Sequence, residues 1–448
     1  MQKSLVTCQF LLWKFQKSNR SRESMTIRST FWVFLGLLAA SFLAGNFTRS
    51  FVYYRVAYFL LFVLLFSLIW GLLSIRGLSV KRSARIHRLP VGAVFEERFE
   101  VVNPTRYGRL WIEIEDQSNL PGSRSSKVIS AVGGRQSRTY VTRTLLQQRG
   151  VFPLGPTRLI TGDPFGLFLF KREFPPVNQL LVLPYIVDLD YFPFLPGLLP
   201  SGRALHRRTL EVSPHAAGVR EYAPGDPLSR IHWKSTARRD HIMVKEFEQD
   251  PQADVWILLD AHRHSHIREK QSKRQQPVEQ FWFWTHKSEV YLAADTYEYL
   301  VSACASIANY YVRSNRAVGF VSHGHSYVAL PVERGERQLA KIIETLALLD
   351  ADGPLTVLGL VNAQASSIAR GSTVVLLTPS RDIQVEMAVD ELLRRDMNPI
   401  VVMVASESFG GEGGSLDVAA HIQARGVPLK ILRCENNILR DLQLNHNV

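Results

Sequence analysis

The sequence contains few cysteines, which limits the structures and metal sites that it can form. Its 448 residues include only three, at positions 8, 304 and 434, far apart along the chain. An odd number of distant cysteines argues against a disulfide framework and against a zinc site built from cysteine pairs. A reducing compartment fits this pattern best.

The sequence also lacks the composition of a disordered or fibrous protein. Apolar residues make up 46% of the chain and charged residues 21%, as in ordinary globular proteins. Residues 262–280 are rich in His, Arg, Lys and Gln and predict a mobile loop. A length of 448 residues predicts two or three domains, at roughly 150 residues per domain.

Two stretches near the amino terminus, residues 31–47 and 56–75, contain no charged residue. Each is close to the roughly 20 residues that a helix needs to cross the hydrocarbon core. Their lengths and aromatic ends favour membrane spans over core helices of a soluble protein or a signal peptide. We therefore expect a transmembrane helical hairpin over residues 29–76, preceded by a cytoplasmic leader at residues 1–28 in which Met25 is an alternative start.

Positive charge is scarce between the two apolar stretches, where only Arg49 and Arg55 occur. Six Lys or Arg residues precede the first stretch, and five follow the second by residue 88. Because cytoplasmic flanks carry an excess of positive charge, we expect two spans in the inner (plasma) membrane, with both termini and the soluble domains cytoplasmic. Attraction to the lipid bilayer explains much of the net charge of +13, and no nucleic-acid-binding motif is evident.

Residues 77–200 contain short runs in which apolar and polar residues alternate, separated by Gly, Pro and Asn. This pattern predicts an antiparallel, β-sandwich-like domain of roughly seven strands. Within it, residues 163–168 read DPFGLF. The Asp-Pro pair and the Gly predict a turn, with both Phe side chains and the Leu packed beneath it.

Residues 251–448 show a different pattern, in which apolar strands alternate with helices. The expected strands are 255–259, 318–322, 327–331, 373–377, 400–405 and 429–432, and the expected helices are 296–312, 336–349, 383–395 and 416–425. This alternation predicts an α/β domain with a doubly wound, mostly parallel sheet covered on both faces. Ligands and partners of such sheets bind at the carboxyl ends of the strands.

The most informative part of the chain is the signature segment, residues 201–250. Gly225 and the Pro before it predict a tight turn, and Asp226 can cap a helix over residues 227–238. A strand over residues 242–247 is expected to follow. The segment also contains a dense pattern of particular residues: Arg220, Tyr222, Gly225, Asp226, Arg230, Ile231, His232, Trp233, Lys234, Ala237, Arg238, Val244, Glu246 and Glu248.

With this pattern, the sequence resembles the bacterial and archaeal family called domain of unknown function 58. The resemblance also covers the order of the parts: a membrane hairpin, a β domain with a DPFGLF-like turn, the signature segment, and a sheet domain similar to the von Willebrand factor A fold. It implies no catalytic activity. It does imply work in a membrane-associated assembly with a MoxR-type AAA+ ATPase and a transglutaminase-like membrane protein.

Two roles are open for the charged residues of the signature segment. The cations are Arg230, Lys234 and Arg238, and the acids are Asp226, Glu246 and Glu248. In the first role, the cations, spaced by four on one helix, form an anion site for a phosphate or a partner carboxylate. In the second, which we favour, the acids pair with the cations while Trp233 packs between the two soluble domains.

Candidate catalytic and metal-binding residues are few. His232 lies three residues from Ser235, but no identifiable Asp or Glu completes a triad. Where von Willebrand A domains hold a divalent cation, a strand ends in Asp-x-Ser-x-Ser, whose oxygen atoms suit Mg²⁺. Here Asp260 follows the strand, but His262 and His264 replace the serines. We expect no cofactor, with Mg²⁺ or Zn²⁺ at these residues as an alternative.

Together these features predict a membrane-tethered cytoplasmic interaction or scaffold protein without catalysis of its own. A MoxR-type ATPase is the expected partner. Its expected binding surface is the upper edge of the sheet domain, at Asp260 and the turns after Leu377 and Ala405. One alternative is a metal-dependent hydrolase centred on Asp260 and the nearby histidines. Another is a structural role in envelope assembly, with the β domain as the binding surface.

Overall fold

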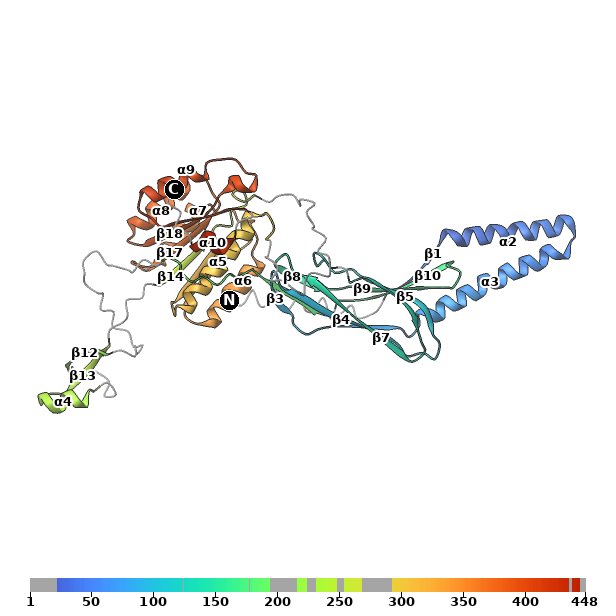
Figure 1. The fold of residues 1–448 in the computed structure, drawn as a ribbon, viewed down its shortest axis with the longest axis horizontal. Coiled ribbons are helices and arrows are strands. Elements are labelled where there is room, and N and C mark those ends of the chain that lie inside the picture. Colours follow the sequence, from blue (N-terminus) through green and yellow to red (C-terminus); the bar gives the residue numbers. More distant parts are fainter. Residues whose placement is uncertain are drawn as a thin grey trace. The chain divides into compact units, whose positions relative to one another are not determined.

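The protein contains two apolar helices near the amino terminus, several separate sheets, and further helices in the second half of the chain (Figure 1). The chain divides into two compact units, the first ending at Pro184 and the second beginning at Tyr185. The finer domain boundaries expected from the sequence stay predictions, and most of the loop expected at residues 262–280 lies outside the described residues. The computed structural model describes residues 22–123, 125–176, 178–193, 216–223, 231–247, 254–267, 292–434 and 437–443.

The first unit contains two apolar helices, α2 (Ser29–Thr48) and α3 (Phe51–Ile75). They lie side by side and antiparallel (Figure 1), and the Tyr54 hydroxyl donates a hydrogen bond of 2.9 Å to Oδ1 of Asn46. At about 1.5 Å per residue, α2 is about 30 Å long, which matches the hydrocarbon core of a bilayer. Both helices are long and apolar enough to cross a membrane, which indicates membrane association. Their orientation in the membrane stays a prediction.

The strands described in the first unit form three sheets. Their order is β1-β10-β9-β5-β6 in the first sheet, β2-β4-β7 in the second and β3-β11-β8 in the third. The strands are β1 (Arg22–Ile27), β2 (Ser79–Ala84), β3 (Arg88–Pro90), β4 (Val94–Asn103), β5 (Arg109–Asp116), β6 (Lys127–Val132), β7 (Gln136–Leu145), β8 (Gly150–Leu154), β9 (Thr157–Gly162), β10 (Phe168–Phe174) and β11 (Asn178–Leu183). Ten of them follow residue 77, so the prediction of roughly seven strands is wrong in number. Gly and Pro residues, such as Gly155 and Pro156 between β8 and β9, divide the runs into more and shorter strands.

The first and second of these sheets share one hydrophobic core. Phe99 of β4 stacks on Tyr140 of β7, with ring centroids 5.0 Å apart. Both belong to a buried cluster with Ile112 and Ile114 of β5 and Leu159 of β9. Alternate residues of β4 are buried, as expected for a strand with one face toward a core. The two sheets therefore pack face to face.

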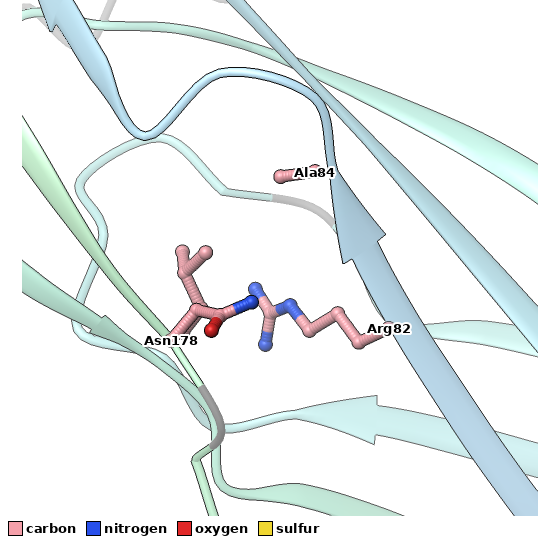
Figure 2. A pocket seen from close by; sticks show the side chains of 4 residues that line it. Arg82, Ala84 and Asn178 are labelled. Atoms are coloured by element: carbon pink, nitrogen blue, oxygen red, sulfur yellow. The ribbon is translucent and has the colours of Figure 1, made fainter.

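A buried ion network also joins these two sheets. Arg82 of β2 donates hydrogen bonds of 2.8–3.2 Å to the carboxylates of Glu97 in β4 and Asp116 in β5. None of the three side chains is more than 8% exposed. Burial raises the pKa of Glu97, and the Arg82 guanidinium opposes this shift. Figure 2 shows Arg82 extending toward Asn178 at a cavity of about 10 Å³, roughly the room of one water molecule.

The DPFGLF turn connects β9 to β10, and Asp163 fixes its shape. The Asp163 carboxylate accepts hydrogen bonds from the backbone N–H groups of Phe165, at 2.9 Å, and Phe168, at 2.6 Å. Leu167 and Phe168 are buried, as predicted. The prediction is wrong for Phe165, whose side chain is 50% exposed because it lies at the tip of the turn.

The second unit contains a six-stranded sheet with the order β16-β15-β14-β17-β18-β19. The strands are β14 (Val255–Leu259), β15 (Val318–His323), β16 (Tyr327–Glu333), β17 (Thr373–Thr378), β18 (Asn398–Val404) and β19 (Leu429–Leu432). All neighbouring strands are parallel except β15 and β16. Every residue of β14 is buried, which is typical of a parallel strand covered on both faces. The six expected strands are confirmed, with ends that differ by at most two residues.

Helices cover both faces of this sheet (Figure 1). The described helices are α5 (Thr296–Arg313), α6 (Glu336–Leu348), α7 (Val357–Gln364), α8 (Gln384–Arg394), α9 (Ser415–Ala424) and α10 (Ile438–Gln443). Side chains of α7, α8 and α9 form one buried cluster with Trp256 and Leu258 of β14, and α5 packs on the other face. The sequence does not predict α7 and α10, since both are short and Gly359 weakens the helical preference of α7.

A separate two-stranded sheet contains part of the signature segment. Strand β12 (Ala216–Glu221) pairs antiparallel with β13 (Met243–Phe247), and α4 (Trp233–Arg239) lies between them in the sequence. The expected continuous helix from residue 227 is wrong. Ile231 forms a β-bridge with Val244, so the helix begins only at Trp233.

Candidate functional site

The candidate site lies at the carboxyl ends of the central strands of the second unit. Strand β14 is the first of the sheet in chain order, and β15 and β17 lie on opposite sides of it. The strands that follow β14 in the sequence are therefore added to the sheet on both sides of it. Doubly wound sheets bind ligands in the crevice at the point where the strand order reverses in this way, which is called the switch point. A pocket of about 410 Å³ lies here, between the turns that follow β14, β17 and β18.

Each of these three turns contributes polar side chains to the pocket. The polar side chains that we consider are His262, His264, Ser380, Arg381, Asp382 and Glu412. Arg381 and Glu412 form an ion pair between the turn after β17 and the turn after β18. The structure therefore brings together the turns after Leu377 and Ala405 with the turn that contains Asp260, as expected for a parallel sheet.

Asp260 follows the last residue of β14 and is only 1% exposed. Its Oδ2 accepts a hydrogen bond of 2.7 Å from the Thr378 hydroxyl, and its Oδ1 accepts one of 2.9 Å from the backbone N–H of His262. Burial raises the pKa of Asp260 to about 6, although both hydrogen bonds oppose the shift. The charge of this carboxyl group therefore changes just below neutral pH.

The histidines after Asp260 make hydrogen bonds that hold their own turn. Nδ1 of His262 lies 3.0 Å from the Ser265 hydroxyl, and Nε2 of His266 lies 3.0 Å from the backbone oxygen of Asp260. The rings of His262 and His264 meet edge to face, with centroids 5.4 Å apart. Burial lowers the pKa of His262, and the neighbouring His264 lowers it further.

These residues, as placed, do not fit a metal centre. Both carboxylate oxygens of Asp260 accept hydrogen bonds from protein groups, and Nδ1 of His262 is engaged by Ser265. Among the described residues, no group of three or more His, Cys, Asp or Glu side chains could hold a metal ion. A zinc site needs such a group in tetrahedral arrangement, and Mg²⁺ needs several free oxygen ligands.

Close backbone packing fixes the turn after β14. The N–H of Gly353 donates to the oxygen of Ala261 at 2.9 Å, and the N–H of Arg263 donates to the oxygen of Gly353 at 3.1 Å. A Cβ atom on Gly353 would lie 1.8 Å from the backbone oxygen of His323, so only glycine fits this position. The backbone that presents Asp260 and the histidines is therefore held from two sides.

The turns after β17 and β18 are also tied to each other. The Thr378 hydroxyl accepts a hydrogen bond of 3.0 Å from the N–H of Ser380, and the Ser406 hydroxyl donates one of 3.1 Å to the oxygen of Pro379. Ser380 and Ser406 are both buried. The pocket wall is thus fixed by internal hydrogen bonds, so little ordering entropy would be lost on binding.

The signature residues on α4 are exposed or hold the helix itself. Nδ1 of His232 accepts a hydrogen bond of 3.2 Å from the N–H of Ser235 and lies 2.7 Å from its hydroxyl, so His232 caps the helix. This capping contact accounts for the proximity of His232 and Ser235. Trp233 is 71% exposed, and Lys234 and Arg238 are exposed one helical turn apart.

The remaining signature residues are described in part or not at all. Arg220 lies on β12, and the N–H of Tyr222 donates a hydrogen bond of 2.8 Å to the oxygen of Ile242. Glu246 lies on β13 opposite Gly218, but the side chains of Arg220 and Glu246 lie outside the description. The residues outside the described ranges are Gly225, Asp226, Arg230 and Glu248. Both proposed roles of the segment therefore stay predictions.

Comparison with known proteins supports the resemblance found in the signature segment. Residues 218–286 match the model of a family described as "Protein of unknown function DUF58". The expected resemblance to DUF58 is confirmed. The uncharacterized protein YeaD of Bacillus subtilis (strain 168) is 22% identical over 326 residues, which cover 70% of this chain and 73% of YeaD.

Among solved structures, the crystal structure of a metal-bound CARDB domain from Pyrococcus furiosus matches 23% of this chain and 91% of its own length, with 12% identity and a TM-score of 0.17. The solution structure of the same domain has the same TM-score, and likeness at this level carries no argument. The DUF58 match, in contrast, contains Asp260, His262 and His264, while Thr378 and the rest of the pocket lie outside it.

The sequence does not identify Thr378 as the partner of Asp260. A signal exists in the strand pattern, because each residue directly follows or ends a buried apolar strand. In the parallel register Leu259 pairs with Leu377, which places Asp260 next to Thr378. That neighbour relation needs the strand order, and the sequence pattern does not supply it.

Proposed function

We propose that this protein is a membrane-tethered interaction or scaffold protein, without catalysis of its own, whose second unit binds a partner at the pocket above β14, β17 and β18. The observation that carries the proposal is the pocket of about 410 Å³ at the switch point of the sheet. Two helices that can cross a membrane supply the tether. Tethering raises the effective concentration of a partner that works at the same membrane.

The arrangement of polar groups favours recognition over catalysis. Asp260 is buried and already bonded to Thr378 and to the N–H of His262, so it shapes the turn. Side chains that line the pocket, including the Arg381–Glu412 pair and the exposed His264, offer charge and hydrogen bonds to a protein surface. Nucleophilic catalysis would need a nucleophile held by an adjacent base, with a third group to orient that base.

The MoxR-type AAA+ ATPase remains the partner that we propose, from the DUF58 resemblance. We also propose that the sheet is of the von Willebrand A type. The central position of its first strand and the single antiparallel edge strand, β16, support this assignment. A partner of such a domain would approach the carboxyl ends of the strands, where the pocket lies.

Affinity purification of the full chain from native membranes tests the proposal. Arg381→Glu replaces the Arg381–Glu412 ion pair with two acids and should reduce recovery of a MoxR-type ATPase at least tenfold, on the scale of one interface hot spot. Arg370→Glu is the matched control, since Arg370 is exposed and precedes β17 at the opposite end of the sheet. Equal loss with both variants, or no ATPase with the unaltered chain, would refute the proposal. Stoichiometric zinc or manganese in the purified chain, lost on Asp260→Ala, would instead support the hydrolase alternative.

A further inference from the structure

The β sheets of the first unit are joined to the end of α3 by a fixed loop. Arg109, which is 5% exposed, donates hydrogen bonds of 3.1 Å to the backbone oxygen of Arg76 and to the Thr105 hydroxyl. A Cβ atom on Gly77 would lie 3.0 Å from the Thr105 side chain. The loop between β4 and β5 is therefore held directly against the residues that follow α3.

The DPFGLF turn makes a second contact with the two apolar helices. The N–H of Arg28 donates to the oxygen of Leu167 at 3.1 Å, and the Thr30 hydroxyl donates to the oxygen of Gly166 at 2.8 Å. Leu167, Phe168 and Phe170 form a buried cluster with side chains of both helices, including Leu64 and Ile75 of α3. The turn thus packs against the first half of α2 and the second half of α3, the half of the hairpin that also meets the loop between β4 and β5.

Exposed aromatic and basic side chains gather on these two segments and beside them. The exposed aromatic side chains are Phe165, at 50%, and Tyr107, at 71%. The exposed cations are Arg28, Arg76, Arg106 and Arg135. Arg135 belongs to this set because its N–H donates a hydrogen bond of 2.7 Å to the oxygen of Thr105. We call these six residues the basal surface of the first unit.

Apolar residues of β1 extend the same region. Met25 and Ile27 pair with Phe170 and Phe168 in the register of β1 and β10, so they lie on the same face of the sheet as these two side chains. Phe168 and Phe170 are buried against the helices, but Met25 and Ile27 are 47% and 45% exposed. An apolar strip of the sheet therefore continues the surface of the hairpin.

We propose that the basal surface rests in the headgroup layer of the membrane that receives α2 and α3, with Phe165 and Tyr107 at the acyl boundary and the arginines bound to anionic phospholipid headgroups. The 25 residues of α3 extend about 37 Å, longer than the hydrocarbon core of about 30 Å, so the end of α3 reaches this layer. Aromatic side chains concentrate at this depth, and arginine binds phosphate groups well. The inference rests on the membrane tether of the proposed function and not on the pocket.

Spin labels at single cysteines in the full chain test the depth of the surface. Cys8→Ser and Cys434→Ser remove two native thiols, and Cys304 can stay because it is buried and burial raises its pKa, which makes it unreactive. Labels are placed by Phe165→Cys and Tyr107→Cys, and the chain is reconstituted in vesicles of phosphatidylcholine and phosphatidylglycerol. The relaxation of each spin label by oxygen, which concentrates in lipid, is divided by its relaxation by a water-soluble nickel chelate. A higher oxygen-to-nickel ratio means that the label lies deeper in the membrane.

Two reference positions make the result decisive. Phe62 is exposed in the middle of α3, so a label at Phe62→Cys should lie in lipid and give a high oxygen-to-nickel ratio. Val94→Cys lies at the start of β4, about 30 Å along the strand from the basal loop, and should report water. Labels at Phe165 and Tyr107 should give oxygen-to-nickel ratios between these two values. Ratios equal to that at Val94 would overturn the inference, while a watery label at Phe62 would refute the membrane tether itself.

The arginines are tested by their preference for anionic lipid. Arg106→Gln combined with Arg135→Gln should reduce the selectivity of the protein for spin-labelled phosphatidylglycerol over phosphatidylcholine, by up to about fivefold per arginine. Arg98→Gln is the control, because Arg98 is exposed on β4 some five residues from the basal loop, beyond a Debye length of about 10 Å. Selectivity unchanged in the double variant, or equally reduced by Arg98→Gln, would overturn this part of the inference.

Discussion

The buried carboxyl group of Asp260 should make the stability of the second unit depend on pH. Burial raises its pKa from 3.8 to about 6. A tenfold change in proton affinity is worth about 1.4 kcal/mol, so ionisation of this group costs the folded state ~3 kcal/mol relative to the unfolded chain. Asp260→Asn removes the titration while it keeps the size of the side chain and one oxygen acceptor for the Thr378 hydroxyl.

The sign of the effect follows from which state holds the proton. Below pH 3.8 both states are protonated, and the wild-type side chain contributes its full stability. Between that pH and about 6, the unfolded chain loses the proton while the folded chain keeps it, so the contribution falls as pH rises. Relative to Asp260→Asn, the wild type should thus lose ~3 kcal/mol over this range and then remain constant.

Hydrogen exchange of the full chain in membranes, followed for peptides from β14 and β17 in increasing urea, measures this difference. Wild type and variant are compared at the same pH, which cancels the intrinsic dependence of exchange on pH. Thr378→Val removes a donor that favours the ionised Asp260 carboxylate and should therefore raise the pKa of Asp260 further. The stability difference should then become constant only at a higher pH than in the wild type. Thr373→Val is the matched control, since Thr373 is buried on the same strand and its hydroxyl makes no described hydrogen bond. If the stability difference is independent of pH, or grows in favour of the wild type as pH rises, the Asp260 carboxyl group does not have a raised pKa in the folded chain.

Two further predictions concern the first unit. Arg82→Met should lower the free energy of unfolding in urea by about 3–5 kcal/mol, because two buried carboxylates lose their partner. Arg143→Met removes an exposed ion pair and should cost less than about 1 kcal/mol. Similar losses in both variants would contradict the stabilising role of the buried network. Gly71→Ala would place a Cβ atom 2.1 Å from the Phe170 ring, so it should lower the free energy of unfolding by about 1–3 kcal/mol and speed proteolysis of the DPFGLF turn. Gly36→Ala is the control, because its Cβ atom would meet no atom within 4 Å and should have neither effect. Unchanged proteolysis in Gly71→Ala would argue against packing of the turn on α3.

The sheet of the second unit can be predicted from the sequence because its strands are short, continuous apolar runs between helices. Residues 255–259 read VWILL, and burial on both faces requires that composition. In the first unit, the sequence predicts strands but not their number or their sheets, since alternation shows which face is buried and not which strand is the neighbour. The packing of Phe170 on Gly71 depends on such neighbours and has no local signal.

The candidate site was predictable in position but not in detail. Asp260 was predicted because it follows a buried apolar strand, and comparison with the Asp-x-Ser-x-Ser motif of von Willebrand A domains singled out the two histidines that replace the serines. The exposure of Phe165, which we expected to be packed, depends on the direction in which the tip of its turn points. The Arg381–Glu412 ion pair could not be predicted either, because its two residues come from turns after different strands. Sequence spacing does not contain those directions.

Photo-crosslinking in native cells can show whether a partner binds at the pocket. A photoreactive amino acid replaces His264, which is exposed at the pocket, or Arg370, which is exposed at the opposite end of the sheet. If the partner binds at the pocket, a crosslinked product with a MoxR-type ATPase should form from position 264 and none from position 370. Crosslinking from position 370 alone, equal crosslinking from both positions, or no product from position 264 would contradict binding at the pocket.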